Sequence, residues 1–177
     1  MAKQAFSIQT KYTHLYFRTS VTPFLKKREI THVIENCLLC FEQFMRKELK
    51  LKAEQMEINL TICGAKRMTQ INGEYRNKPK PTDVLSFPIE SMLYKEKQLP
   101  SYLTQLLMLG DIVICKEVLL QQAKSFDATI VEEFVRLFVH GLLHLTDMDH
   151  ERSKREEKMM FEIQDQLIAK VLKKLKS

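Results

Sequence analysis

The stretch TIVEEFVRLFVHGLLHLTDMDHE, residues 129–151, carries most of what the sequence says about the fold. Thr129 followed by Glu132 has the spacing of a capping box, in which each side chain binds the other residue's backbone N–H, so a helix should begin there. The apolar residues that follow keep a helical period and predict a helix that runs to about Leu145. Residues 146–149 are typical of a turn. The sequence therefore predicts a central helix that ends in a turn.

The rest of the chain predicts an α+β fold. Its expected helices have apolar residues at every third or fourth position, and its expected strands show alternation or a short apolar run. These patterns place helices at about 23–51, 65–72, 117–124 and 153–175 and strands at about 15–17, 56–62, 84–87 and 108–114. With the central helix, they predict a small mixed sheet of about four strands packed with about five helices. We expect a single metal-dependent hydrolase domain over residues 1–177.

Length, composition and charge exclude several classes of protein. With 177 residues, of which 45% are hydrophobic and 28% charged, the chain can bury a core and does not have the composition of a disordered protein. No apolar run reaches the roughly 20 residues of a membrane span, and the N-terminus does not resemble a signal peptide. We therefore expect a cytoplasmic protein with no membrane partner. The net charge of +6 permits contact with phosphate backbones without requiring it.

The four cysteines lie in apolar stretches, at positions 37, 40, 63 and 115. Without a secretion signal, they are expected to be reduced thiols. Cys37 and Cys40 have the spacing of a zinc-binding pair. However, the chain has no second pair of this kind, and these two residues lie inside a helical pattern. We interpret them as buried core residues.

Three histidines near the end of the central helix form the strongest functional signal. His140 and His144 lie one turn apart on the same helix face, about 6 Å along the axis. The turn that follows is expected to return the chain so that His150 lies near the other two, which gives the spacing H-x3-H-x5-H. Three imidazole nitrogens can bind one zinc ion at about 2.0–2.1 Å and leave a fourth position open, as in catalytic zinc sites. Nickel or copper would accept the same ligands. The sequence therefore predicts a metal site at the end of the central helix.

Gly141 follows the first of these histidines. The same histidine spacing occurs in metzincin proteases, but these enzymes place a glutamate base at that position, so the glycine argues against peptide hydrolysis. Glycine inside a helix also costs about 1 kcal/mol relative to alanine. This cost makes sense if another group approaches the helix backbone closely at Gly141.

Three segments together resemble the YbeY family of zinc-dependent endoribonucleases: YRNKPKPTDVLSFP at 75–88, LGDIVI at 109–114 and HGLLHLTDMDH at 140–150. The resemblance covers about residues 56–151. It implies a single-strand-specific endoribonuclease that acts in ribosomal RNA maturation, at the 3′ end of 16S rRNA, and in ribosome quality control. The implied partners are single-stranded RNA, ribosomal RNA and the small ribosomal subunit, and no DNA. The family pattern H-G-x-L-H-L-x-G-Y-D-H has Gly and Tyr where this chain has Asp147 and Met148.

The resemblance also implies roles for individual residues. It makes the three histidines the ligands of one zinc ion per chain, with His140 also a catalytic residue, and it makes Arg76 the residue that holds the RNA phosphate. A guanidinium group suits this role because it can form two hydrogen bonds with a phosphate and stabilise charge that builds on phosphorus. Lys78 and Lys80 add positive charge to the same loop and are expected to contact the RNA backbone.

The remaining roles stay open from the sequence. Asp111, in an apolar strand, or Asp149, beside His150, could accept a hydrogen bond from a zinc-bound histidine, and Asp111 could equally bond a loop. The general base could be Asp111, Asp149, Glu151 or the ribose 2′-hydroxyl. Two other functions are possible: a non-catalytic ribosome- or RNA-binding factor with a structural zinc, and a zinc hydrolase of another substrate. A fourth protein ligand would favour the structural zinc.

Overall fold

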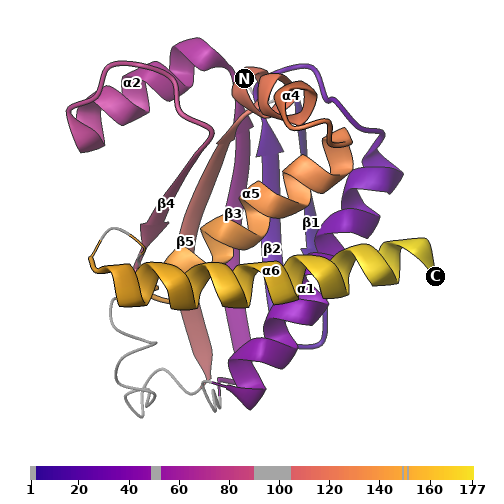
Figure 1. Cartoon of the computed structure of the whole chain (residues 1–177). Coiled ribbons are helices and arrows are strands. Elements are labelled where there is room, and N and C mark those ends of the chain that lie inside the picture. Colours follow the sequence, from indigo (N-terminus) through magenta and orange to yellow (C-terminus); the bar gives the residue numbers. More distant parts are fainter. Residues whose placement is uncertain (1–2, 49–52, 90–104, 149, 151) are drawn as a thin grey trace.

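Figure 1 shows the computed structural model of the chain, which describes residues 3–48, 53–89, 105–148, 150 and 152–177. The strands form a mixed sheet in the order β1-β2-β3-β5-β4. They are β1 (Gln4–Gln9), β2 (Thr13–Thr19), β3 (Gln55–Cys63), β4 (Val84–Pro88) and β5 (Leu106–Cys115). The inner strands β2, β3 and β5 are parallel, and the outer strands β1 and β4 are antiparallel to their neighbours. The α+β class and the mixed sheet agree with the sequence analysis.

The first strand, β1, is the one that the sequence analysis does not predict. It pairs with β2 along its whole length, from Gln4 opposite Thr19 to Gln9 opposite His14. Its inward face carries few apolar side chains, and among them Phe6 stacks on Phe17 of β2 with ring centroids 4.6 Å apart. An alternation of apolar and polar residues this short is only weak evidence for a strand, because β1 is stabilised mainly by its pairing with β2. The sheet therefore has five strands where about four were predicted.

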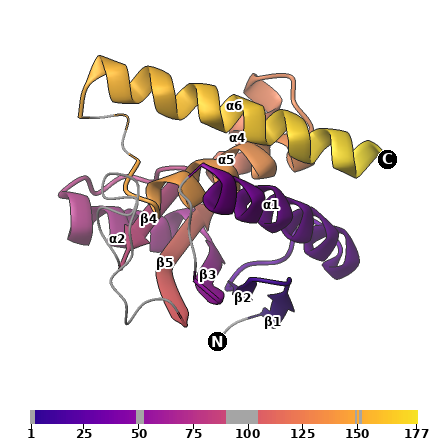
Figure 2. The same ribbon diagram turned by 90° about the horizontal axis from the view of Figure 1, so that it is seen from below.

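The described ranges contain five helices: α1 (Lys27–Lys47), α2 (Ala65–Arg76), α4 (Lys116–Ser125), α5 (Ile130–His144) and α6 (Lys154–Lys176). Figures 1 and 2 show three layers, in which α1 and α5 cover one face of the sheet and α6 lies across both of them. The central helix of the sequence analysis is α5, so it is enclosed between the sheet and α6. None of the helices in these ranges is long and apolar enough to cross a membrane.

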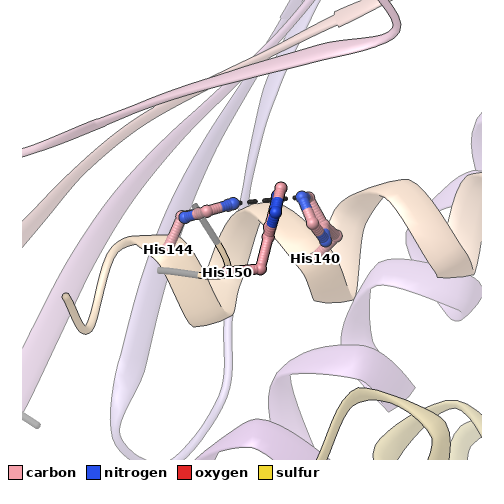
Figure 3. A group of neighbouring side chains, drawn as sticks. All are labelled: His140, His144 and His150. Carbon is pink, nitrogen blue, oxygen red and sulfur yellow. Dashed lines mark hydrogen bonds between the residues drawn. The ribbon is translucent and has the colours of Figure 1, made fainter. Parts of the chain in front are cut away.

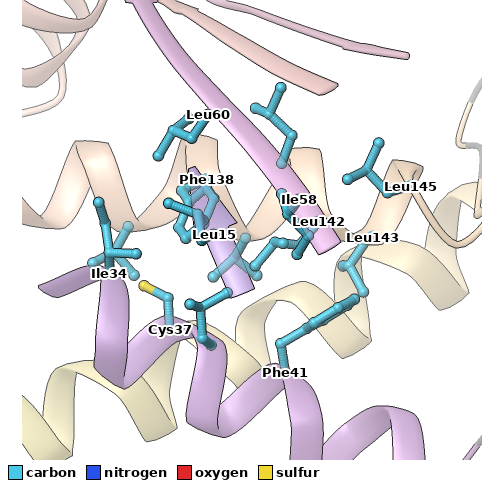
Figure 4. Packing of buried hydrophobic residues seen from close by; sticks show 14 of the residues in the cluster. Leu15, Ile34, Cys37, Phe41, Ile58, Leu60, Phe138, Leu142, Leu143 and Leu145 are labelled. Atoms are coloured by element: carbon cyan, nitrogen blue, oxygen red, sulfur yellow. The ribbon is translucent and has the colours of Figure 1, made fainter. Parts of the chain in front are cut away.

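The main hydrophobic core lies between the sheet and the layer of α1 and α5 (Figure 4). Leu15, Ile58 and Leu60 of the strands meet Phe138 and Leu142 of α5, and all five are fully buried or nearly so. Burying a side chain of this size contributes about 1.5–3 kcal/mol. A smaller second core on the other face holds α2 against β3, β4 and β5 through residues that include Met68, Ile71, Leu85 and Val113. Both cores fix the elements that carry the candidate site.

The start of α5 has the predicted capping box. The backbone N–H of Glu132 donates to Oγ1 of Thr129 at 3.1 Å, and Oε2 of Glu132 accepts from the N–H of Thr129 at 2.9 Å. Near the other end, a Cβ on Gly141 would lie 2.9 Å from Cγ2 of Ile112 on β5 and 3.2 Å from Oγ of Ser86 on β4. The group that was expected to approach the helix backbone at Gly141 is therefore the sheet, through β4 and β5.

A second glycine fixes how β4 lies on β5. Gly110 has φ 137°, a backbone conformation that residues with a side chain rarely adopt. A Cβ there would also collide with the carbonyl oxygen of Phe87. The register of β3 with β5 also shifts next to it, between Glu57 and Ile58, as in a β-bulge. This contact fixes how closely the last residues of β4 approach β5.

The cysteine pair on α1 belongs to the core. Cys37 and Cys40 are both buried, and burial raises the pKa of each thiol. A thiol with a raised pKa is a poor metal ligand, since metals bind the thiolate. The interpretation of this pair as core residues is confirmed.

Candidate metal centre

Three imidazole rings converge at the C-terminal end of α5. His140 and His144 come from the last turns of the helix and His150 from beyond the turn, and Figure 3 shows the rings gathered around one point. The two Nε2 atoms of His140 and His144 are 3.0 Å apart, and one ligand nitrogen from each of the three residues lies within 4.8 Å of the others. In a tetrahedral zinc site, two nitrogen ligands are about 3.3 Å apart. The three histidines therefore form a group that can bind a metal ion.

Gln164 of α6 orients the first of these rings. Its Oε1 lies 2.7 Å from Nδ1 of His140, and its side chain is buried. Because a carbonyl oxygen only accepts, the Nδ1–H must donate, which leaves Nε2 of His140 with a lone pair for a metal. Burial lowers the pKa of His140, against the effect of the Gln164 hydrogen bond, and the neighbouring His150 lowers it further. The net effect is a lowered pKa, which favours the neutral imidazole, the form that binds metals.

The histidines open into a cleft of about 470 Å³. The same cleft is lined by three arginines that come from different parts of the chain, Arg76, Arg136 and Arg152. Its other walls are residues 82–86 and Pro88 of the loop and strand β4, Asp147 and Met148 of the turn, and Phe161 of α6. A metal-binding group beside several guanidinium groups is an arrangement suited to a phosphate-containing substrate.

The sequence profile of a family described as "Endoribonuclease YbeY" matches residues 19–172. This chain belongs to the YbeY family. The curated relatives named "Endoribonuclease YbeY" include one from Persephonella marina, 40% identical over 68% of this chain and 74% of the relative. A second, from Acinetobacter baumannii, is 35% identical over 83% of this chain and 84% of the relative. The family resemblance seen in the sequence is therefore confirmed.

A solved structure supports the fold of this YbeY-family chain. It is the solution structure of a Thermotoga maritima protein, with a TM-score of 0.53 at 22% sequence identity, and the likeness covers 92% of this chain and 91% of that one. At this identity the comparison concerns the fold alone. It agrees with the mixed sheet and helices of the present structure.

The turn before His150 is where this chain departs from the family pattern. Asp147, in place of the family's Gly, has φ 67°, a left-handed conformation that aspartate tolerates better than most residues. Arg152 holds it there: Nη2 donates to Oδ1 at 2.6 Å, and Nη1 donates to Oδ2 and to the backbone oxygen of Asp147 at 3.2 Å each. Met148, in place of Tyr, is buried in the core. The turn thus keeps its shape through the ion pair between Asp147 and Arg152, which lie on either side of His150 in the sequence.

Arg136 is a cleft residue that the sequence analysis missed. Its guanidinium group donates to both oxygens of the buried Glu133, at 2.6 and 2.9 Å, and Nη2 lies 3.7 Å from Oδ2 of Asp83. This network ties α5 to the loop before β4. The spacing could have revealed Arg136, because it lies one turn before His140 on the same face of the helix. Gln164 could have been noticed as a polar residue in the apolar stripe of α6.

The residues predicted to handle RNA are only partly brought together. Arg76 is the last residue of α2 and lines the cleft with the histidines. Lys78 and Lys80 follow in the same loop with exposed side chains, and neither is among the residues that line the cleft. They lie in the chain between two residues that do line it, Arg76 and Thr82, so their positive charge is outside the cleft itself.

Of the two candidate hydrogen-bond partners of the histidines, Asp111 is placed differently from the prediction. Asp111 lies on β5 next to Ile112, but alternate residues of a strand face opposite sides. Ile112 meets α5, whereas Asp111 lines a separate cavity with residues such as Arg67 and Tyr75. Asp111 is therefore not placed to bond a metal-binding histidine, a role that Gln164 takes for His140. The other candidate partner, Asp149, and the candidate base Glu151 are outside the described residues.

Proposed function

We propose that this chain is a zinc-dependent endoribonuclease that cuts single-stranded RNA, and that its natural target is ribosomal RNA in the small ribosomal subunit, at the 3′ end of 16S rRNA. Its family membership supports an RNA substrate. The observation that carries the proposal is the convergence of three imidazoles within 4.8 Å in a cleft that Arg76 also lines. A role in ribosome quality control would follow from the same activity.

The donor set supports zinc as the metal. Three neutral imidazoles match the ligands of catalytic zinc sites, and the group of ligands in the described ranges contains no fourth histidine, cysteine or carboxylate. A structural zinc would require such a fourth ligand, so the arrangement favours the enzyme over a binding factor with a structural zinc. When bound, zinc would supply Lewis-acid catalysis, which polarises a phosphoryl oxygen and activates water.

The side chains of the cleft supply the other requirements of phosphodiester cleavage. We assign to Arg76 the role of holding the scissile phosphate, because its guanidinium can donate two parallel hydrogen bonds and stabilise the charge of the transition state. Of the histidines that would bind zinc, His140 and His144 are positioned by α5, and Gln164 orients the ring of His140. We keep Lys78 and Lys80 as weaker contacts for RNA that extends beyond the cleft.

The contacts of the cleft carboxylates reduce the number of candidates for the general base. The described carboxylates that line the cleft are Asp83 and Asp147, and both interact with arginines, Asp83 with Arg136 and Asp147 with Arg152. The oxygens of both carboxylates already accept hydrogen bonds, those of Asp147 from Arg152 and those of Asp83 from Val84 and Gln122, so neither carboxylate is placed to take a proton from the reacting groups. This leaves Asp149, Glu151 and the 2′-hydroxyl of the RNA as the candidate bases.

We place this activity in the cytoplasm and in a single domain. Four free, buried cysteines fit a reducing compartment. A continuous hydrophobic core that joins residues from β1 to α6 supports one domain over the chain. Ribosomal RNA as a substrate is consistent with both.

The decisive experiment is metal reconstitution with matched variants. Protein stripped with a chelator should lose cleavage of a single-stranded RNA and regain it with zinc. His144→Ala should abolish the zinc-dependent activity, and Arg76→Ala should lower it by about 100-fold or more while zinc still binds. His32→Ala and Arg28→Ala on α1 are the matched controls and should cleave as the wild type does. Cleavage by His144→Ala and Arg76→Ala at the wild-type rate would overturn the proposal.

A further inference from the structure

The aromatic ring of Phe161 stands at the edge of the metal-binding group. It belongs to α6, and its ring centroid lies 5.6 Å from that of His150 with an angle of 26° between the planes, a stacked arrangement. Phe161 also lines the cleft and is 38% exposed. Its neighbour Met160, by contrast, is fully buried in the core. Phe161 is therefore an exposed aromatic side chain beside the site where RNA would be cut.

The stack on His150 determines how this ring can be used. The contact with the His150 imidazole restricts the orientation of the phenyl ring, so less conformational freedom remains to be lost when a ligand binds. The ring surface that stays exposed borders the cleft. Aromatic faces in nucleic-acid clefts stack on bases of any sequence, because every base has a π-face.

We propose that Phe161 is a stacking platform for a nucleobase next to the scissile phosphate. This inference rests on the proposed function, since it names a subsite for the same RNA substrate. The phosphate would lie between Arg76 and the histidines, and the base of an adjoining nucleotide would lie on the phenyl ring. The subsite accepts any of the four bases, provided that the base has left its own stack.

The proposal gives a physical reason for a single-strand preference. In a duplex each base is stacked and paired, and moving one onto Phe161 would require breaking those contacts. In a single strand the base is free to turn out toward the protein, as in other proteins that recognise unpaired RNA. Phe161 therefore acts as a specificity-determining residue, while Arg76 contacts the backbone that both forms of RNA share.

The test compares RNA with and without bases. The probes are a single-stranded 2′-O-methyl uridine hexamer and the same sugar-phosphate hexamer lacking all bases, which have equal length and charge. Binding to the zinc-loaded protein is measured by fluorescence anisotropy, and the length of each probe is checked after titration. Wild-type protein should bind the intact hexamer about 5- to 150-fold more tightly than the base-free one, the range expected for one base stacked on an aromatic ring.

The variants separate stacking from other roles of Phe161. Phe161→Leu keeps an apolar side chain but removes the aromatic face, so its preference for the intact hexamer should fall by about 5-fold or more. Phe161→Tyr should keep the preference. Tyr16→Ala is the matched control, because Tyr16 is 37% exposed and its ring also lies on a histidine, His14, at a centroid distance of 4.4 Å, but on β2 away from the cleft. Its preference should equal that of the wild type.

Two results would overturn the inference and leave the proposed function intact. One is a wild-type protein that binds both hexamers equally well while still cleaving RNA. The other is a Phe161→Leu protein with the full wild-type preference. If the wild type neither binds the intact hexamer nor cleaves RNA, the proposed function itself is wrong. Zinc affinity is measured in each preparation, and if it falls in Phe161→Leu, the comparison of the two hexamers on wild-type protein decides.

Discussion

Nδ1 of His140 lies 2.7 Å from the side-chain oxygen of Gln164, and this hydrogen bond joins α5 to α6 beside the metal-binding group. The two residues are 24 positions apart, and α6 brings them together by packing against α5. The bond fixes which nitrogen of His140 carries the proton, so the geometry of the site depends on how α6 is packed as well as on α5.

Replacing Gln164 with Leu should weaken metal binding. Leucine has a similar size but cannot accept a hydrogen bond, so the Nδ1–H of His140 would be left buried without a partner. Loss of such a partner typically lowers metal affinity by about 10- to 100-fold. The affinity is measured by competition between the protein and a chromogenic zinc chelator. Gln164→Glu is the control, because it keeps an acceptor oxygen, and it should bind zinc at least as tightly as the wild type. Equal affinity in Gln164→Leu and wild type would contradict the role of this bond.

The ion pair between Asp147 and Arg152 should be measurable in the metal-free protein. Asp147 is buried, so Arg152→Ala would leave a carboxylate without its partner in a strained turn, and the free energy of unfolding should fall by about 1–3 kcal/mol. Adding Asp147→Gly to this variant should recover most of the loss, because glycine adopts a positive φ freely. Urea denaturation in the presence of a chelator gives these values.

The double variant also tests whether the pair positions His150. If the turn is held by the ion pair, zinc affinity should fall in Arg152→Ala and return in Asp147→Gly/Arg152→Ala. A double variant that stays as destabilised as the single one, with equally weak zinc binding, would show that Arg152 acts through other contacts.

The three histidines of the candidate metal centre could be predicted from the sequence because they are close in the chain. Helical geometry alone places His140 and His144 on one face, and the turn residues return His150 to it. The same local logic predicted the capping box at Thr129, which the structure confirms. Signals of this kind need only a few neighbouring residues.

The rest of the site depends on contacts between distant elements, which the sequence alone does not reveal. Phe161 and Gln164 reach the histidines only because α6 packs across α5. Asp111 could have faced either side of its strand, and the choice depends on the pairing of β5 within the sheet. Strand β1 was missed for a related reason, since a short alternation becomes a strand only when a neighbour pairs with it.

Gly141→Ala should destabilise the protein even though alanine is the better helix former. The new Cβ would lie 2.9 Å from Cγ2 of the buried Ile112, so the Ile112 side chain, α5 or β5 must shift. Overpacking of this kind costs about 1–3 kcal/mol, and helix propensity returns at most about 1 kcal/mol. We expect a net loss of about 1 kcal/mol in thermal or urea unfolding, together with weaker zinc binding as the histidines move with the helix.

Gly73→Ala on α2 is the matched control for this prediction. Its Cβ would lie 3.5 Å from Pro79, an ordinary contact distance. This substitution should therefore stabilise the protein, by up to about 1 kcal/mol, because it gains helix propensity without crowding. A stabilising effect of both substitutions would show that the contact between α5 and the sheet adjusts at no cost.

Asp83 should make part of the protein's stability depend on pH. Burial opposes the charge of this carboxylate, but hydrogen bonds from Gln122 and from the N–H of Val84, with the nearby charge of Arg136, hold the pKa of Asp83 below its ordinary value. A group with a lowered pKa stabilises the folded state above its unfolded pKa, about 3.9, and this contribution is lost as the pH falls through the lower folded pKa. Asp83→Asn removes the titration and should lower the free energy of unfolding by about 1 kcal/mol near neutral pH.

Urea unfolding of the metal-free wild type and of Asp83→Asn, from pH 7 to pH 3, measures the gap between their free energies of unfolding. The contributions of other titrating groups cancel in this gap. The gap should stay constant down to about pH 4 and shrink below it. A gap that stays unchanged into the acid range would mean that Asp83 contributes by packing and hydrogen-bond geometry and that its charge has no part.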